Sequence, residues 1–201
     1  MSRFVAKELF ESPELLDGLV ELFERTGSVC FCRYWHFSGD KNDWQARCAF
    51  DREVNRTEFV EAARQQSDEA RGLVAVDTEH QNLVVGWLKV APARSLKKMV
   101  EQRYYRSLPT LQGEREGVFT VGCALVDPAY RHQRIAHHLV EAAVVAVRRW
   151  GGHSIEAMPR VPAAPPVPDE EIFTGPRAAF DAAGFVCVEG MDSYPILRRS
   201  V

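Results

Sequence analysis

The sequence lacks long hydrophobic runs, a strong excess of charge of one sign, and an even set of cysteines. No apolar stretch is long enough to cross a bilayer, and residues 1–9 lack the apolar core of a secretory signal, so we expect no membrane partner. The formal net charge of -3 provides no field that would recruit nucleic acid. Five scattered cysteines in a chain too large to depend on disulfides predict reduced thiols and a cytoplasmic location.

What is present is the composition of an ordinary globular protein. Hydrophobic residues make up 46% and charged residues 26% of the 201 residues. This length leaves room for a substantial core, and the sequence contains no internal repeat. We therefore expect a single domain over residues 1–201.

Helix-like and strand-like periodicities alternate along the chain, which predicts an α/β fold. Ser12 and Pro13 open the first helix, and Asn55 is placed to cap the second. Hairpin-forming strands come first and a strand–helix–strand crossover follows, so we expect a central sheet of mixed direction with helices on both faces. The expected helices cover residues 13–25, 55–66, 94–106, 134–150 and 174–183. The expected strands cover residues 29–37, 73–77, 83–91, 118–126, 154–158, 185–189 and 194–198.

The most informative segment is 118–143, which predicts a buried strand, a short turn and a long amphipathic helix. A helix start carries unpaired N–H groups and partial positive charge, so it can hold a phosphate. A strand followed by such a turn is therefore a candidate binding site for a cofactor that carries phosphate. The turn places six residues at the helix start: Arg131, His132, Gln133, Arg134, Ile135 and Ala136.

Two motifs resemble those of the GNAT acetyltransferase superfamily. Pro128, Arg131 and Ala136 fit its pattern of strand, Pro, Arg/Gln-x-x-Gly-x-Gly/Ala and helix. The segment 174–185, which ends in Ala-Gly-Phe, is similar to a second family motif. The resemblance implies a splayed mixed sheet and acetyl-CoA as cosubstrate. It places the pyrophosphate at the turn, with Arg131 and His137 as its side-chain partners.

Arg134 departs from the family pattern, because it stands where the first glycine usually stands. Helix-start backbone angles do not require glycine, so we expect Arg134 to adopt ordinary helical angles with its side chain on solvent or phosphate. The alternative is that this large residue disrupts the phosphate-binding site and that the protein no longer binds the cofactor.

The resemblance also implies that the end of the strand 118–126 receives the pantetheine arm of the cofactor. An amide-rich arm can pair with free backbone groups as if it were another strand. A bulge in this strand, expected from the family alone, would expose the backbone of Ala124, Leu125 and Val126. The alternative reading is that Leu125 and Val126 are plain core residues, and the two readings are compatible.

The second motif places two residues at family positions near the cofactor. Thr174 falls where Asn is common, and Phe180 falls where many members have the Tyr that protonates the leaving thiolate. Phenylalanine has no proton to give, so we expect Phe180 to pack beside the cofactor. Glu156 is the candidate base, with a solvent-facing strand residue as the alternative. Tyr194 and Cys123 are weaker candidates for the acid.

The segment 29–36 has the most unusual composition, Val-Cys-Phe-Cys-Arg-Tyr-Trp-His. It is similar to a Cys-x-Cys-x-x-Tyr-Trp strand in one subgroup of these acetyltransferases, so we expect a strand with one face on an acceptor pocket. Cys30, Cys32, His36 and Cys48 lack the usual spacing of zinc ligands. We therefore expect no metal and buried thiols instead.

Together these features predict an acetyl-CoA-dependent N-acetyltransferase in which a small amine or a peptide amine attacks the thioester directly. The loops 37–55 and 159–173 are expected to select this acceptor, and a homodimer is one arrangement that we keep open. Two rival functions also stay open. One is a non-catalytic coenzyme-A-binding sensor or assembly module, and the other is a structural α/β domain without a cofactor.

Overall fold

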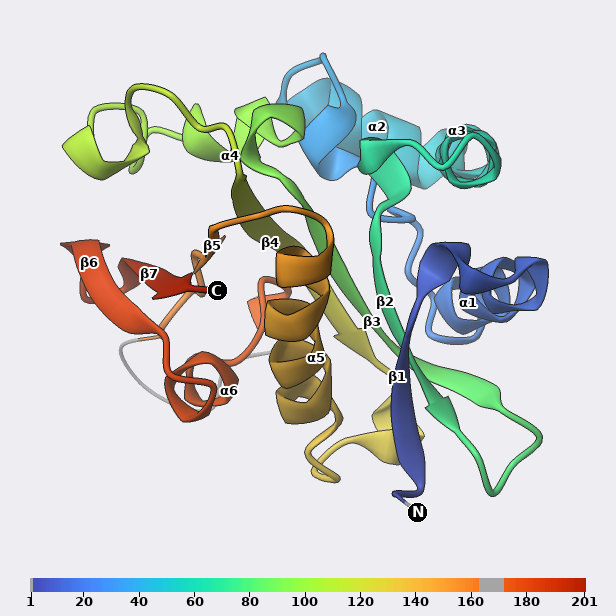
Figure 1. The fold of residues 1–201 in the computed structure, drawn as a ribbon. Helices are drawn as coiled ribbons and strands as arrows, with labels where there is room; N and C mark the ends of the chain where they lie inside the picture. The colour runs from blue at the N-terminus through green and yellow to red at the C-terminus, as the bar shows by residue number, and fades with distance from the viewer. Residues whose placement is uncertain (1, 163–171) are drawn as a thin grey trace.

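The computed structural model describes residues 2–162 and 172–201, and its centre is a seven-stranded sheet in the order β1-β2-β3-β4-β5-β7-β6 (Figure 1). Neighbouring strands are antiparallel except β4 and β5, which run parallel. The expected sheet of mixed direction is therefore confirmed. The strands are β1 (Phe4–Glu8), β2 (Gly72–Asp77), β3 (Leu83–Pro92), β4 (Val118–Val126), β5 (Ser154–Ala157), β6 (Val186–Met191) and β7 (Tyr194–Ser200).

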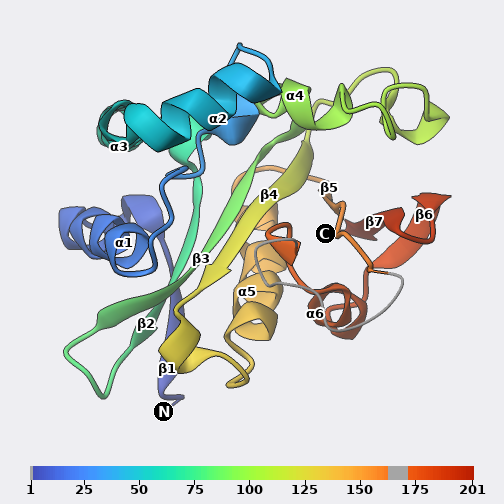
Figure 2. The ribbon, with the colours of Figure 1, turned by 180° about the vertical axis from the view of Figure 1, so that it is seen from behind.

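Helices cover both faces of the sheet, as the sequence predicts (Figure 2). One hydrophobic cluster joins the strands to α5 (Ile135–Arg149) and α6 (Arg177–Ala182). A second cluster joins them to α1 (Pro13–Arg25), α3 (Arg52–Arg64) and α4 (Lys97–Val100), and α2 (Lys41–Phe50) leads directly into α3. Short 3-10 turns connect these elements: η1 (Leu9–Glu11), η2 (Tyr34–His36), η3 (Asp68–Ala70), η4 (Ala93–Ser95), η5 (Pro109–Leu111) and η6 (Pro128–Tyr130).

The first three helices of the chain agree only in part with the helices that the sequence predicts. α1 forms where it is predicted, because its apolar residues recur at helical spacing and are buried. The prediction that Asn55 caps the next helix is wrong: α3 begins at Arg52, and Asn55 is buried inside it, where its side-chain amide donates to the Val29 carbonyl at 3.1 Å. The sequence predicts a loop over 37–55, where the structure has α2. No residue of α2 is buried and its apolar periodicity is weak, so this helix gives no clear sequence signal.

Two predicted helices are shorter in the structure. The helix expected over 94–106 is limited to α4, and the helix expected over 174–183 is limited to α6. The loop 159–173, which is rich in proline and is expected to select the acceptor, falls largely on residues 163–171, which lie outside the described residues.

The prediction of a strand over residues 29–37 is wrong. The chain turns there instead: Phe31 and Cys32 have positive φ values of 43° and 54°, and η2 follows. Phe31, Cys32 and Trp35 are nonetheless buried, because the turn directs them into the core that α1 shares with the sheet. The edge beside β2 is taken by β1, whose residues are all half-buried and gave no strand signal.

β4 and β5 pair over a short stretch and then diverge, as Figure 2 shows. Beyond this stretch β4 runs on to Val126 alongside β3. The sheet is therefore splayed at the carboxyl end of β4. The register joins Val118, Phe119 and Thr120 to Ser154, Ile155 and Glu156.

α5 packs closely on β3 because Gly86 has no side chain. A Cβ atom at Gly86 would lie 2.8 Å from Cγ2 of Ile135 and 3.3 Å from Cδ1 of Leu139, which are buried residues near the start of α5. It would also lie 3.4 Å from the Cβ of Ala75 on β2. This glycine therefore sets how near the start of α5 can approach the sheet.

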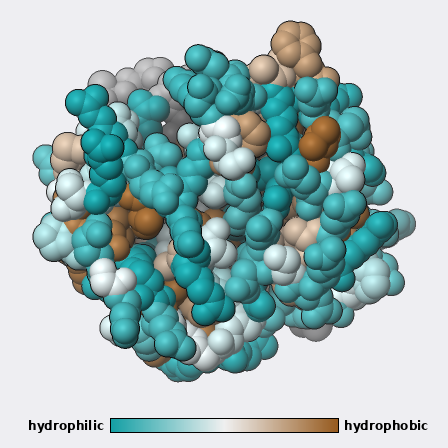
Figure 3. Space-filling model, turned by 90° about the horizontal axis from the view of Figure 1, so that it is seen from above, coloured by the Kyte–Doolittle hydropathy of each residue, from teal (hydrophilic) through white to brown (hydrophobic). Residues whose placement is uncertain are grey.

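The upper end of the molecule, which carries α2 and α4 in Figure 1, is mostly hydrophilic, with hydrophobic atoms in small scattered areas (Figure 3). Apolar side chains scattered singly over a surface are normal and need no partner. Among residues 2–162 and 172–201, no helix combines the length and apolar character needed to cross a membrane.

We expect Gly86→Ala to destabilise the fold and to push the start of α5 outward. The new methyl group would overlap Ile135, so the free energy of unfolding should fall by about 1–3 kcal/mol, measured by urea unfolding. Val145→Ala is the control, because Val145 is 59% exposed on α5 and its truncation should be near neutral. Equal stability of the two variants would contradict the packing argument.

Candidate functional site

The open edge of β4 is the first part of the candidate site. Leu88 of β3 pairs with Ala124 of β4, and Val90 pairs with Val121. Between these two pairs the chain advances two residues on β3 but three on β4, so β4 holds one extra residue, which is a β-bulge. The bulge lies at Gly122–Cys123, where the family resemblance implies one. Beyond it, the last three residues of β4 are half-buried rather than buried: Ala124, Leu125 and Val126.

The amide of Ala124 already has a partner from the same chain. Its N–H donates to the carbonyl of Phe173 at 2.7 Å. Gly175, with a φ of 96°, brings this segment close: an added Cβ would lie 3.5 Å from the Ala124 Cβ and 3.1 Å from the Phe180 ring. Thr174 is buried in the same turn, and its hydroxyl oxygen accepts a backbone hydrogen bond at 3.2 Å. The structure therefore brings Thr174 and Phe180 to the open edge of β4.

The turn after β4 is anchored at both ends. Asp127 accepts from the Ala129 N–H at 2.9 Å and so caps η6, and Arg25 at the end of α1 donates to the Asp127 carboxylate at 2.7 Å. Ile135 is buried at the start of α5, with Ala136 and His137 half-buried after it. The exposed residues of the turn are His132, Gln133 and Arg134, next to the half-buried Arg131.

The expectation for the backbone of Arg134 is wrong. Arg134 has φ 60° and ψ 19°, the left-handed region that favours glycine, and His132 has φ 61°. A left-handed residue beside an ordinary one turns successive N–H groups toward one point, which makes an anion-binding concavity. The turn thus has the shape that glycine would permit, although large residues hold it at a cost of about 1 kcal/mol each.

Positive charge accompanies these N–H groups. Arg131 and Arg134 carry fixed charges, and His132, His137 and His138 lie on the same turn and the first turn of α5. Partial burial, followed by the neighbouring Arg134, lowers the pKa of His137, so its imidazole is neutral at neutral pH. A neutral imidazole beside cationic groups can donate a hydrogen bond without adding to their mutual repulsion.

Glu156 lies fully buried between two guanidinium groups. Its carboxylate accepts from Nε of Arg198 at 2.9 Å and from Nη2 of Arg115 at 2.5 Å. Both arginines also donate to the Thr110 carbonyl, so this ion cluster ties β5, β7 and the loop before β4 together. The alternative of a solvent-facing glutamate is therefore wrong. The two guanidinium groups compensate the charge of the buried carboxylate, and catalysis by Glu156 stays a prediction.

The candidate acids lie elsewhere. Tyr194 is half-buried and stacks on Tyr104, with ring centroids 4.4 Å apart and planes at 7°. Cys123 is buried in the bulge of β4. Phe180 is fully buried and meets Phe185 edge to face at 5.3 Å, so its ring belongs to the core beside the open edge. Within the described chain, the hydrogen-bond partners of the Glu156 carboxylate are arginines, so neither candidate acid is paired with the candidate base.

Sequence reasoning missed the contact between η2 and β4. Trp35 is buried, and its indole Nε1 donates to the Gly122 carbonyl at 3.0 Å. Lys89, on β3 beside the bulge, is fully buried and donates to a backbone carbonyl, and burial lowers its pKa. Burial, together with the nearby Lys89, lowers the pKa of His36 to about 2. The aromatic composition of residues 31–37 signalled a buried segment, but it gave no sign of the turn that aims Trp35 at β4.

Of the cysteines near this segment, Cys32 is buried, and Cys30 and Cys48 are half-buried. Burial raises the pKa of Cys30 to about 11 and holds that of Cys32 well above its usual value. Trp87 donates its indole N–H to the Cys32 sulfur at 3.1 Å. Across the described ranges, no group of three or more histidine, cysteine or acidic side chains is arranged to hold a metal ion. The thiols behave as small hydrophobic side chains.

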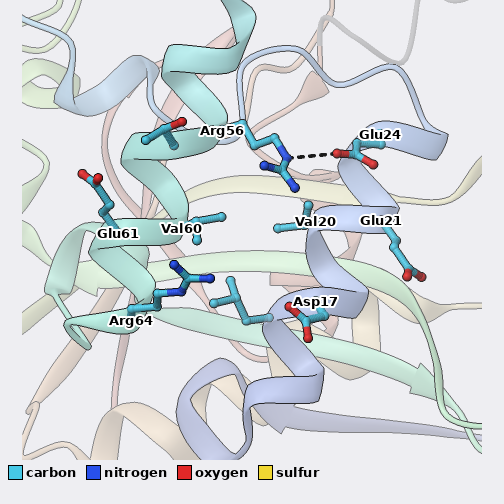
Figure 4. Close-up of a pocket in the computed structure, with 10 residues that line it drawn as sticks. Asp17, Val20, Glu21, Glu24, Arg56, Val60, Glu61 and Arg64 are labelled. Atoms are coloured by element: carbon cyan, nitrogen blue, oxygen red, sulfur yellow. Dashed lines mark hydrogen bonds and ion pairs between the residues drawn. The ribbon is translucent and has the colours of Figure 1, made fainter.

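A groove of 590 Å³ lies between α1 and α3 (Figure 4). Arg56 bridges it to Glu24 at 3.1 Å, and Val20 and Val60 contribute apolar surface. Its lining residues all come from α1 and α3, so the groove is separate from the open edge of β4 and from the turn before α5.

Comparison with solved structures finds similar folds at low sequence identity. The GNAT family N-acetyltransferase YhbS from Escherichia coli, in complex with CoA, is 17% identical, with a TM-score of 0.52, over 100% of this chain and 82% of that chain. The yncA protein of Salmonella typhimurium, with its cofactor acetyl-CoA, is 16% identical, with a TM-score of 0.54, over 99% and 94%. The PaiA N-acetyltransferase of Thermoplasma acidophilum, in complex with coenzyme A, is 10% identical, with a TM-score of 0.52, over 98% and 99%. At these identities the likeness shows a shared fold.

A family model identifies the sequence more directly, although a search of curated proteins found no match. The model described as the acetyltransferase (GNAT) family matches residues 31–165, well over half of the chain. The matched region includes the open edge of β4, the left-handed turn and Glu156. The chain therefore belongs to the GNAT acetyltransferase family.

Proposed function

We propose that the protein is an acetyl-CoA-dependent N-acetyltransferase that acts on a small amine or a peptide amine. The observation that carries this proposal is the open backbone edge of β4 next to the left-handed turn at residues 131–134. The three solved structures named above were obtained with CoA or acetyl-CoA, which supports the choice of cosubstrate.

In this proposal the turn binds the pyrophosphate and β4 binds the pantetheine arm. The N–H groups of the turn meet the phosphate oxygens, and Arg131, Arg134 and the neutral His137 support them. The arm pairs with the backbone of residues 124–126 as an added strand would. Because the Phe173 carbonyl holds the Ala124 N–H, the arm must take its place.

Acetyl-CoA supplies an acyl carbon that a neutral amine attacks directly. The new C–N bond forms as the C–S bond breaks, and the thiolate leaves with the electron pair. In this proposal a backbone N–H of β4 stabilises the carbonyl oxygen, which becomes negative as the amine attacks. The amine loses one proton to water, and the thiolate gains one from water or from Tyr194, since Phe180 has no proton to give.

The finer features of the proposal concern acceptor, assembly and compartment. The acceptor is an amine that approaches β4 from the side of η2, where aromatic side chains gather. A homodimer stays a prediction, and the exposed Val186 and Val188 on the edge strand β6 are the surface that favours it. The five free cysteines fit the reducing cytoplasm that the sequence predicts.

Isothermal calorimetry with CoA, followed by an assay of thiol release from acetyl-CoA over a panel of amines, tests this function. We expect binding and amine-dependent release. Tight binding with no release on any amine or peptide would favour the non-catalytic sensor or assembly module. No heat with CoA, together with no rise in Tm, would leave only the structural domain without a cofactor.

Arg134→Gly should stabilise the free protein and weaken coenzyme binding at the same time. Glycine relieves the left-handed strain, so the free energy of unfolding should rise by up to about 1 kcal/mol. Loss of a cation from the turn should raise the Kd for CoA several-fold at low salt, and the difference should shrink at high salt.

Arg148→Ala is the charge-matched control for this variant, because Arg148 is exposed at the other end of α5. Calorimetry at two ionic strengths compares the two variants with the parent protein. If Arg134→Gly binds CoA as tightly as Arg148→Ala does, the turn does not hold the phosphates.

Glu156→Gln separates a structural carboxylate from a catalytic base. We expect a fall of roughly 2–3 kcal/mol in the free energy of unfolding, because two guanidinium groups lose their anion and only Arg198 reaches solvent appreciably. Turnover at low temperature should fall less than about tenfold, with the same pH profile. A loss of about a hundredfold or more at unchanged stability would instead make Glu156 the base.

A further inference from the structure

We propose that Trp35 is a positioning residue that holds the bulge of β4, and through it the backbone edge that receives the thioester arm. This inference rests on the proposed function. It concerns the segment Cys-Phe-Cys-Arg-Tyr-Trp at residues 30–35, which the proposed acyl transfer does not otherwise use.

The first observation is one buried hydrogen bond. The indole Nε1 of Trp35 donates to the Gly122 carbonyl at 3.0 Å, and Trp35 is only 6% exposed. Gly122 falls in the step where the register between β3 and β4 shifts, so it has no Cα partner on β3. A buried carbonyl that leaves its ladder needs another donor, and Trp35 supplies it.

The second observation is the close fit around Gly122. A Cβ atom there would lie 3.3 Å from Cδ1 of Trp35 and 3.0 Å from Cδ of Lys89. An added side chain would therefore press on both the indole and the buried Lys89 stem, and these groups would have to shift by a few tenths of an ångström. Close packing thus accompanies the hydrogen bond at Gly122.

The third observation is that Trp35 is itself held from several directions. The left-handed Phe31 and Cys32 turn the chain before it, and Tyr34 meets its ring at 4.9 Å. Arg33 forms ion pairs with Glu58 and Glu69, at 3.1 and 2.9 Å, and joins η2 to α3 and η3. Strained, well-anchored backbone of this kind is expected where a side chain must be aimed.

The fourth observation links Trp35 to the open edge. Phe173 lies against the Trp35 ring at 6.0 Å and an interplanar angle of 32°, while its carbonyl accepts the Ala124 N–H. Trp35 therefore contacts both the bulge and the segment that now occupies the edge. The arm of the coenzyme would enter beside the same indole, and the aim of the Ala124 amide depends on the bulge that Trp35 fixes.

The experiment compares Trp35→Phe, Trp35→His and Trp150→Phe. Phenylalanine keeps an aromatic six-membered ring but lacks the pyrrole part of the indole with its N–H, whereas histidine has a smaller ring with an N–H. Trp150 is the control because its indole also makes one hydrogen bond, to Glu8 at 2.8 Å, at the far end of α5. The readouts are Tm, the Kd for CoA and acetyl-CoA, and the carbonyl resonance of bound acetyl-CoA labelled with ¹³C at the acyl carbon.

We expect Trp35→Phe to weaken acetyl-CoA binding roughly tenfold, and to move the carbonyl resonance from its bound position toward that of the free thioester. Trp35→His should recover part of both changes. Trp150→Phe should lower Tm without affecting either. If Trp35→Phe lowers Tm but leaves the Kd and the resonance unchanged, Trp35 is merely structural and the proposal is overturned. If the parent protein binds neither CoA nor acetyl-CoA, it is the proposed function that fails.

Discussion

The structure depends on the parting of β4 from β5 after a short parallel stretch. A strand inside a continuous sheet bonds to two neighbouring strands, whereas β4 has β3 alone as a strand neighbour beyond Thr120, and its Ala124 N–H bonds instead to the Phe173 carbonyl. Such an opening is stable only if both halves of the sheet are held by other contacts. On one side the bulge, Trp35 and the buried Lys89 fix the course of β4. On the other side Glu156 binds Arg115 and Arg198 and fixes β5 against β7.

The turn before α5 is built on the same opening. Asp127 at the end of β4 is joined to Arg25 of α1, and Gly86 lets the start of α5 settle on β3. The end of β4 and the start of α5 are therefore each held by a contact to another element, on either side of the turn. The strained backbone of Arg134 persists because both of its flanks are anchored, which is the condition under which a non-glycine residue keeps a left-handed conformation.

How much the sequence predicts depends on how strongly a segment is buried. β4 was predicted to the residue and α5 to within one residue at each end, because their apolar periodicity is strong and their ends carry clear turn signals. The mixed sheet and the family followed from these two elements and the Ala-Gly-Phe motif. Residues 29–37 were predicted wrongly because aromatic residues suit a strand and a buried turn equally well. The family motif singles out position 134, but it does not predict the left-handed φ of Arg134. That angle depends on how the chain is anchored on both sides of the turn.

The details of the site were harder to predict, because they depend on partners far away in sequence. The burial of Glu156 requires Arg115 and Arg198, and no local pattern joins these three residues. The contact of Trp35 with Gly122 likewise joins the first quarter of the chain to its middle. The hydrogen bond between Ala124 and Phe173 joins β4 to the segment that follows the proline-rich loop. The composition of this loop predicts irregular backbone but does not predict which part of the fold the loop contacts.

A strand edge kept open for a substrate is also a template for unwanted pairing with other chains. The Phe173 carbonyl caps the Ala124 amide at that edge, and the half-exposed Phe173 ring covers the indole behind it. This segment therefore covers part of the edge that β4 would otherwise present to other chains. In the proposed mode of binding, the coenzyme displaces this same short segment, so one piece of chain would cover the edge in the free protein and yield it to the pantetheine arm.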